Sequence, residues 1–474
     1  MKESRKKAGR PKAGKRKTGK GNTGKRPAHA ELATRKPRTD TPKPQVQRGA
    51  VNDDLLRALK AWASGKQGGE QSADDMLSSA GKAGRWELKG SLDRVFRNYA
   101  RLSWLIRRQN AEPTPEWLWA AASVVLDRAP LEDVAKRIAV TSADLSPYAG
   151  KLGRLSNEGI AHEAMPNPVR AECPDDLYLE FSNAYGPELE SELKALNHGG
   201  PLDIRVNTLK GDMAALLETL NVGDTEVSPT PYAPLALRAK GKPDLAVTEA
   251  FTSGLFDMQD EGSQLVAALV DAKPGDQVLD FCAGAGGKTL ALAAAMANKG
   301  HLVAADTSAK RLARAKLRLK RAGAENAERV LLTGTDDDPY FKRKAAQFDR
   351  VLVDAPCSGT GAWRRHPEAK WGVPVDLKRL TALQDSILTR AAKMLKRGGR
   401  LVYATCSMLP AENAERADAF LAAHPGFKRV DAADAWGKAM IPAPYPGRDR
   451  AMLQLTPFQH GTDGFFTAIF ERTS

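Results

Sequence analysis

Apolar residues recur along this chain with several different spacings, and each spacing predicts a different kind of element. From about 49 to 165 they return every three or four residues, which is the period of helices with one buried face. This spacing predicts one continuous helix through residues 92–106 and further helices over 115–127 and 131–138. Five arginines of the first of these helices could contact RNA, although a solvated face is the commoner arrangement: Arg94, Arg97, Arg101, Arg107 and Arg108.

The pattern changes to short alternating runs between about 174 and 250. Residues 202–207 alternate like a strand, and the segment that follows reads as a helix to Leu220. Together they predict a small α+β unit. Arg205 and Asn207 share one face of the strand because side chains two residues apart point the same way. They could contact a ligand, but polar residues on a surface are the commoner case.

From residue 251 onward, short β-branched apolar runs alternate with helical patterns. Four runs read as strands, over 276–281, 301–305, 350–353 and 399–407. Strands that alternate with helices are typical of an α/β fold with a mostly parallel sheet flanked by helices. In such sheets ligands bind at the carboxyl ends of the strands, so the residues just beyond those ends are the candidates for chemistry.

A glycine-rich turn follows the first of these strands and opens an Ala/Leu-rich helix. Its residues are Cys282, Ala283, Gly284, Ala285, Gly286, Gly287 and Lys288. A phosphate-binding loop of the G-x-x-x-x-G-K-T type would need glycine where Cys282 stands. Asp306, which ends the next strand, lies 22 residues after Gly284, near the offset at which an acid binds ribose hydroxyls. The combination suits an adenosine cofactor such as S-adenosylmethionine.

Two cysteines follow the last two strands. Cys357 stands in a Pro/Gly/Ser turn three residues after Asp354, and Cys406 is the second-to-last residue of the run over 399–407. If these strands are parallel neighbours, about 4.8 Å apart, both thiols emerge over the same edge of the sheet. A single free cysteine is usually a small buried hydrophobe. Two cysteines in matching positions, one of them beside an acid, indicate chemistry.

Charge is concentrated at the amino terminus. The chain has 474 residues and a net charge of +15, and residues 1–48 carry +14 of it, from 17 Lys/Arg against three acids. This segment has almost no large apolar side chain, so we expect a disordered basic tail that attracts phosphates. A solubilising tail without a specific partner is the alternative.

Two further absences shape the expectations. No apolar run is long enough to span a membrane and no signal peptide is visible, so a cytoplasmic location is expected. The four cysteines show no metal-binding or disulfide spacing, so no metal is expected. The expected domains are the tail over 1–48, a helical domain over 49–165, the α+β unit over 174–250 and a catalytic domain over 251–474.

Several motifs carry a specific resemblance. They are residues 354–361 (DAPCSGTG), 365–368 (RHPE), 370–371 (KW), 403–407 (YATCS) and 463–466 (DGFF). In this order they resemble the RsmB-like RNA cytosine-5 methyltransferases of the bacterial Rsm and eukaryotic Nop/Nsun group. The resemblance covers about 174–474 and implies a class I, Rossmann-like S-adenosylmethionine-dependent fold with a mostly parallel seven-stranded sheet. The helical region loosely resembles a NusB-like RNA-binding domain. The family usually has Ala-Pro where this chain has Gly284-Ala285.

The resemblance also implies roles for individual residues. Cys406 would be the nucleophile that attacks cytosine, and Cys357 would assist release of the product. Asp354 would donate a hydrogen bond or proton to the ring, with Lys288 as its helper. Asp306, Asp354 and the loop over 282–288 would hold the cofactor. Asp336 fits best as the acid that contacts adenine, with Thr335 and Asp337 as alternatives.

The expected partner is RNA, with small-subunit (16S) rRNA as the substrate and tRNA as the alternative, and we expect a monomer. Three other classes remain open. A DNA cytosine methyltransferase would use Cys357 as its nucleophile. A non-catalytic RNA-binding ribosome-assembly factor would not need Cys406. A small-molecule methyltransferase would leave the basic tail and the helical domain without a task.

Overall fold

The computed structural model describes residues 48–65, 77, 82–138, 146–221, 225–335, 338–438, 441 and 443–474. The tail predicted over 1–48 lies outside these ranges, apart from its last residue. Within the described ranges, no helix has the length and apolar character needed to cross a bilayer. The same ranges hold no group of three or more His, Cys, Asp or Glu residues arranged to hold a metal ion.

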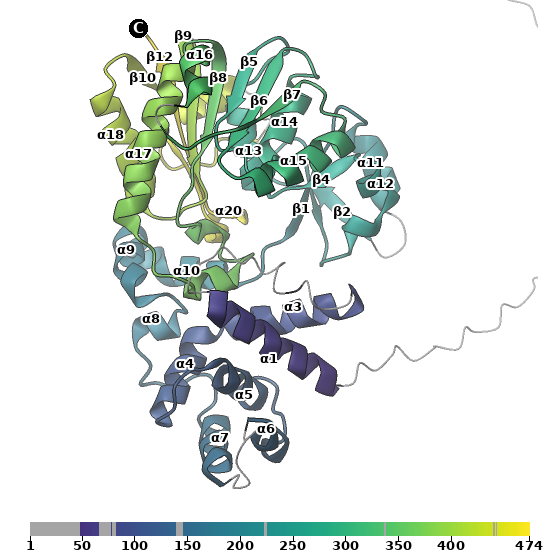
Figure 1. The fold of residues 1–474 in the computed structure, drawn as a ribbon, viewed down its shortest axis with the longest axis vertical. Helices are drawn as coiled ribbons and strands as arrows, with labels where there is room; N and C mark the ends of the chain where they lie inside the picture. Colours follow the sequence, from purple (N-terminus) through teal and green to yellow (C-terminus); the bar gives the residue numbers. More distant parts are fainter. Residues whose placement is uncertain are drawn as a thin grey trace, which may run out of the picture. The chain divides into compact units, whose positions relative to one another are not determined.

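The amino-terminal part consists of helices that pack around one core. Leu59, Leu105 and Ile106 are fully buried there, and Trp119 is almost so. Figure 1 shows these helices in purple and blue. They are α1 (Arg48–Gly65), α3 (Lys82–Phe96), α4 (Tyr99–Arg108), α5 (Pro115–Val125), α6 (Leu131–Ile138) and α7 (Ser146–Glu158).

The single helix predicted over 92–106 is wrong, because the chain forms α3 and α4 with a break at residues 97–98. The buried carboxylate of Glu172 accepts hydrogen bonds from the backbone N–H groups of Ala100 and Arg101, at 2.9 and 3.1 Å. A carboxylate at this position satisfies free N–H groups in the first turn of α4. Glu172 lies about 70 residues away, so the local pattern carries no sign of the break.

Most arginines of this region form hydrogen bonds or ion pairs with other residues of the protein. Arg97 donates to the backbone carbonyls of Asn197 and Arg364, at 2.7 and 2.8 Å. Ion pairs join Arg94 to Asp127, Arg101 to Glu172 and Arg108 to Glu158. A chain of short helices then leads to the next sheet: α8 (Asn167–Arg170), α9 (Asp175–Tyr185) and α10 (Leu189–Asn197).

A small antiparallel sheet follows, in the order β2-β3-β1-β4. Its strands are β1 (Leu202–Val206), β2 (Val227–Pro229), β3 (Ala236–Ala239) and β4 (Phe256–Met258), with helices α11 (Met213–Leu220) and α12 (Glu249–Thr252). The expectation that Arg205 and Asn207 lie on the surface is wrong, because both are buried. Arg205 Nε donates to Gln259 Oε1 at 2.7 Å. Asn207 donates to the carbonyls of Gly254 and Ala322.

The large sheet confirms the α/β class. Seven of its eight strands run in the order β10-β12-β9-β8-β5-β6-β7, and the eighth, β11, pairs with β12. The pairs that join β7, β6, β5, β8 and β9 are parallel, whereas β12 is antiparallel to β9 and β10. The strands are β5 (Gln277–Asp280), β6 (His301–Asp306), β7 (Ala327–Leu331), β8 (Phe348–Asp354), β9 (Leu395–Thr405), β10 (Phe427–Val430), β11 (Leu453–Leu455) and β12 (Phe465–Arg472).

Alternate residues of the central strands supply two apolar layers. Val351 and Val353 of β8 pack with residues of α17 and α18, and Leu352 packs with residues of α13 and α14 on the other face. Figure 1 labels these four helices around the sheet. The helices of this part are α13 (Glu261–Leu269), α14 (Gly287–Ala295), α15 (Ala309–Ala322), α16 (Pro339–Lys344), α17 (Leu377–Met394), α18 (Ala414–Ala423), α19 (Ala432–Lys438) and α20 (Pro457–His460). Short 3₁₀ helices occur at Gly186–Glu188, Leu245–Val247, Thr360–Ala362, Pro367–Trp371 and Pro410–Glu412.

Candidate active site

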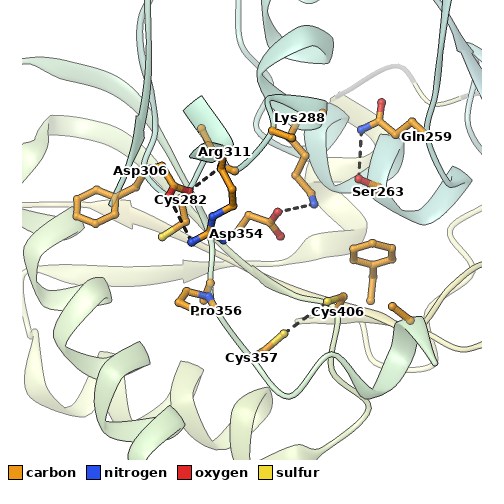
Figure 2. Close-up of a pocket in the computed structure, with 18 of the residues that line it drawn as sticks. Gln259, Ser263, Cys282, Lys288, Asp306, Arg311, Asp354, Pro356, Cys357 and Cys406 are labelled. Atoms are coloured by element: carbon orange, nitrogen blue, oxygen red, sulfur yellow. Dashed lines mark hydrogen bonds and ion pairs between the residues drawn. The ribbon is translucent and has the colours of Figure 1, made fainter. Parts of the chain in front are cut away.

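A cavity of about 790 Å³ lies where the loops after β5, β6, β8 and β9 meet. Because β5, β6, β8 and β9 are parallel, their carboxyl ends open onto one edge of the sheet, which is where α/β folds bind ligands. Figure 2 shows the polar groups and sulfurs that these loops direct into the cavity. Gln259 lies just before α13 and Ser263 lies in its first turn, and both line one side of the cavity. The Ser263 hydroxyl accepts a hydrogen bond from Gln259 Nε2 at 3.1 Å.

The two cysteines meet in this cavity. β8 pairs Asp354 with Ala404 of β9, so the turns that carry Cys357 and Cys406 leave the sheet side by side. Their sulfurs are 3.5 Å apart. The hydrogen bond to Cys406, together with burial, raises the pKa of the Cys357 thiol well above its ordinary value. Cys357 therefore keeps its proton at neutral pH and can donate it toward Cys406.

Lys288 and Asp354 form an ion pair in the same cavity. Lys288 stands in the first turn of α14, and its Nζ lies 2.7 Å from Asp354 Oδ2 at the end of β8. Burial lowers the pKa of Lys288, but the charge of Asp354 and the hydrogen bond to it outweigh burial and raise the pKa. Lys288 is therefore a cation beside the sulfurs, and Figure 2 shows it reaching from its helix toward Asp354.

Asp306 organises the glycine loop. One oxygen of its carboxylate accepts from the backbone N–H of Gly284 at 2.9 Å, and the other accepts from that of Ser308 at 2.7 Å. Arg311 lies 3.3 Å from the same carboxylate. Gly286 has a φ of +82°, and a Cβ there would stand 3.2 Å from the side chain of Ala315, so glycine permits both the turn and the close approach of α15.

The residues present fit an adenosine cofactor with a positive charge. The carboxylates of Asp306 and Asp354 face the cavity and suit ribose hydroxyls and a sulfonium. The apolar side chains of Phe281, Leu332 and Ile387 line it as well and suit a base. Gly286 of the loop packs against α15. The other six loop residues line the cavity: Cys282, Ala283, Gly284, Ala285, Gly287 and Lys288.

Of the predicted adenine contacts, Asp336 and its alternative Asp337 lie outside the described residues. The other alternative, Thr335, bonds to the Thr333 hydroxyl at 3.0 Å.

Glu412 is a site residue that sequence reasoning missed. Its carboxylate is fully buried and accepts from the backbone N–H and the hydroxyl of Ser358, from the Ser407 hydroxyl and from Gln384 Nε2. Ser358 follows Cys357 and Ser407 follows Cys406, so one carboxylate ties together the two turns that carry the thiols. Its sequence context, Pro-Ala-Glu-Asn, held no signal of this task.

Arg365 forms a second unexpected junction. Its guanidinium contacts the carboxylates of Asp260 at 2.7 Å and Asp463 at 2.5 Å, and the carbonyl of Pro201 at 3.0 Å. Burial and the charge of Asp260 raise the pKa of Asp463 to about 7, although Arg365 opposes them. The motifs containing Arg365 and Asp463 were visible in the sequence, but their mutual contact was not. The neighbouring His366 lines the cavity.

Two family descriptions match most of the segment that builds this site. Residues 267–471 match the family described as 16S rRNA methyltransferase RsmB/F, and residues 173–246 match the ferredoxin-like domain of RsmF/B-like methyltransferases. Curated relatives agree. The chain is 37% identical over 332 residues to the probable ribosomal RNA small subunit methyltransferase B of Bacillus subtilis, which covers 67% of this chain and 71% of the relative. It is 37% identical over 291 residues to the ribosomal RNA small subunit methyltransferase B of Yersinia pseudotuberculosis, covering 61% and 67%.

Solved structures share the fold. PH0851 superposes with a TM-score of 0.72 at 25% identity and covers 89% of this chain and 99% of its own. A methyltransferase homolog protein from Pyrococcus horikoshii has a TM-score of 0.54 at 26% identity, covering 64% and 97%. NSun6 from the same organism, solved with SFG, has a TM-score of 0.56 at 22% identity, covering 64% and 98%.

Proposed function

We propose that this chain, which belongs to the 16S rRNA methyltransferase RsmB/F family, methylates carbon 5 of a cytosine in small-subunit rRNA through a covalent bond to Cys406. S-adenosylmethionine is the cofactor and, when bound, supplies an electrophilic methyl group. The observation that carries the proposal is the thiol pair, 3.5 Å between sulfurs, facing the Lys288–Asp354 ion pair in one cavity.

The reacting carbon explains why two thiols and a proton source are needed. Carbon 5 of cytosine is a poor nucleophile. When the Cys406 thiolate bonds to carbon 6, the electron pair of the double bond between carbons 5 and 6 shifts toward carbon 5 and ring nitrogen 3. Carbon 5 then becomes enamine-like and nucleophilic. A proton or hydrogen bond at ring nitrogen 3 stabilises the charge that builds there. Asp354 delivers it, and Lys288, held 2.7 Å away, is the cation that supplies it.

Release of the product breaks the bond between the Cys406 sulfur and carbon 6. Once carbon 5 has taken the methyl group, its remaining proton passes to solvent and the electrons of that C–H bond re-form the ring double bond. The bond between carbon 6 and sulfur breaks with its electron pair going to the Cys406 sulfur, and ring nitrogen 3 returns its proton to Asp354. The Cys357 thiol stays protonated and lies 3.5 Å from that sulfur, so it donates to the departing thiolate. Glu412 holds the two turns at the spacing that this transfer requires.

The target base must leave its stack to meet both Cys406 and the methyl donor. A cavity of about 790 Å³ at the end of the sheet admits a cofactor and one extruded base but not a duplex. An exposed or flexible cytosine in RNA is therefore the fitting substrate.

A direct assay uses the purified full chain, S-adenosylmethionine labelled in its methyl group, and small-subunit rRNA transcribed in vitro. After digestion to nucleosides, the label should appear in 5-methylcytidine. Cys406→Ala should abolish it, whereas Cys173→Ala, which alters a buried thiol outside the cavity, should keep it. Label in another nucleoside would overturn the chemistry. A parallel reaction contains tRNA in place of rRNA, and label on tRNA alone would overturn the substrate. Full labelling by Cys406→Ala would show that Cys406 is not the nucleophile.

A further inference from the structure

Helix α15 carries more positive charge than its packing requires. Seven of its 14 residues are Lys or Arg and none is acidic. It buries a narrow apolar stripe against the sheet, so its cations lie along the outer face and the two flanks. The stripe consists of Leu312, Ala315, Leu319 and Ala322.

Four arginines lie along one flank of this helix. Residues three or four positions apart on a helix are neighbours, which places these arginines in one row. We call this row the arginine flank: Arg311, Arg314, Arg318 and Arg321. Arg311 and Arg318 line the cavity, so the flank borders the cavity.

Three members of the arginine flank are held by acids of the protein. Arg311 pairs with Asp306, and Arg318 and Arg321 each lie 3.1 Å from a carboxylate oxygen of Asp257. Arg321 also lies over the Phe251 ring, 3.7 Å from its centroid. These contacts fix the flank in place. They also leave each guanidinium partly exposed, with 46% of the Arg311 side chain accessible.

Arg314 differs from its neighbours. It is exposed, and within the described part of the chain it forms no ion pair with a carboxylate. It stands one turn from both cavity-lining members, Arg311 and Arg318. Its charge is therefore left uncompensated beside the cavity. The cofactor has no phosphate, whereas each nucleotide next to an extruded base brings one, and Arg binds phosphate well.

We propose that the arginine flank, through Arg314, binds a backbone phosphate of the RNA next to the target cytosine. The inference rests on the proposed function and deepens it by assigning a surface to the RNA. A phosphate contact positions the strand without reading its sequence. The flank would therefore orient any RNA that enters the cavity, and the choice of cytosine would come from elsewhere.

The same helix offers a matched control. Lys316 and Lys320 lie on the opposite flank, are exposed, have no carboxylate partner among the described residues and do not line the cavity. Arg314→Gln and Lys316→Gln each remove one exposed charge from one helix. Binding of the full chain to in vitro transcribed small-subunit rRNA is measured from 50 to 400 mM KCl, and S-adenosylmethionine affinity is measured alongside.

Arg314→Gln should reduce the slope of log K against log salt by about one, as expected for one phosphate contact. At 0.1 M salt this corresponds to a loss of roughly five- to eightfold in RNA affinity. Lys316→Gln should stay within about twofold of wild type, because a distant charge adds only a screened field. Cofactor affinity should be unchanged in both variants.

Equal losses of RNA affinity in the two variants would overturn the proposal that the arginine flank binds a phosphate, since the helix would then act only as a diffuse positive field. A fall in cofactor affinity for Arg314→Gln with an unchanged salt slope would also overturn it. Methylation by wild type is scored in the same samples. If wild type makes no 5-methylcytidine, the proposed function fails, while the salt slopes of the two variants still show whether the arginine flank binds a phosphate.

Discussion

Glu412→Ala should damage stability and catalysis together, because this carboxylate joins the two cysteine turns. One oxygen accepts from the Ser358 N–H at 2.9 Å and from Gln384 Nε2 at 3.0 Å. The other accepts from the hydroxyls of Ser358 and Ser407, each at 2.5 Å. The hydroxyls can turn to new acceptors, but the N–H and the amide cannot. The partly buried Ser358 N–H and one N–H of Gln384 then lose their acceptor, while Gln384 Nε2 keeps its bond to the Pro356 carbonyl at 3.0 Å, so we expect a cost of about 2–4 kcal/mol.

Glu412→Gln should cost less. Its oxygen can face the Ser358 N–H and the Gln384 amide, and its NH₂ can donate to the two hydroxyls, which rotate to accept. Only the strengthening by charge is lost, about 1–2 kcal/mol in all. The control is Glu415→Ala, whose carboxylate is 59% exposed and 4.0 Å from Arg416, and which should stay within about 0.5 kcal/mol of wild type.

Urea unfolding followed by intrinsic fluorescence measures the stability of these variants, and single-turnover methyl transfer measures their chemistry. The rate should fall in the order wild type, Gln, Ala, with cofactor affinity unchanged, because Glu412 does not line the cavity. This role of Glu412 is wrong if Glu412→Ala unfolds at the same urea concentration as Glu415→Ala and transfers methyl groups at the wild-type rate.

Three further predictions follow from the site and the charge pattern. Cys357→Ala should accumulate an RNA–protein adduct that survives denaturing electrophoresis, because the donor beside Cys406 is gone; an adduct that persists when Cys406 is also replaced would contradict the assignment. Burial raises the pKa of Asp280 to about 7, so its contribution to stability is present below about pH 4 and is lost as pH rises through 7. Asp280→Asn should therefore lose less stability than wild type between pH 5 and 8, and parallel urea midpoints over this range would disprove the argument. Deletion of residues 1–48 removes +14 of charge and should flatten the salt dependence of RNA binding; an unchanged slope would show that the tail does not contact RNA.

Much of the catalytic sheet was predictable because its strands are short apolar runs that end at turn residues. β8 and β9 are examples, and their parallel pairing carries Cys357 and Cys406 to one cavity. This inference needed only the pattern of each strand and the rule that parallel neighbours end at the same edge. It also assumed that the two strands are neighbours, which the structure confirms.

Features that depend on distant partners could not be predicted in this way. The break between α3 and α4 is made by Glu172, which is far from both helices in sequence. Arg205 looked like a surface residue on an alternating strand, yet Gln259 and the packing of α13 bury it. Glu412 gave no signal because its four donors come from three separate segments.

The most direct test of the account is bisulfite sequencing of total RNA from cells that lack the gene, complemented with wild type or with Cys406→Ala. We expect that one cytosine of small-subunit rRNA loses its methyl mark, regains it with wild type and stays unmarked with Cys406→Ala. Marks that are unchanged by loss of the gene, or a mark restored by Cys406→Ala, would contradict cytosine-5 methylation through Cys406.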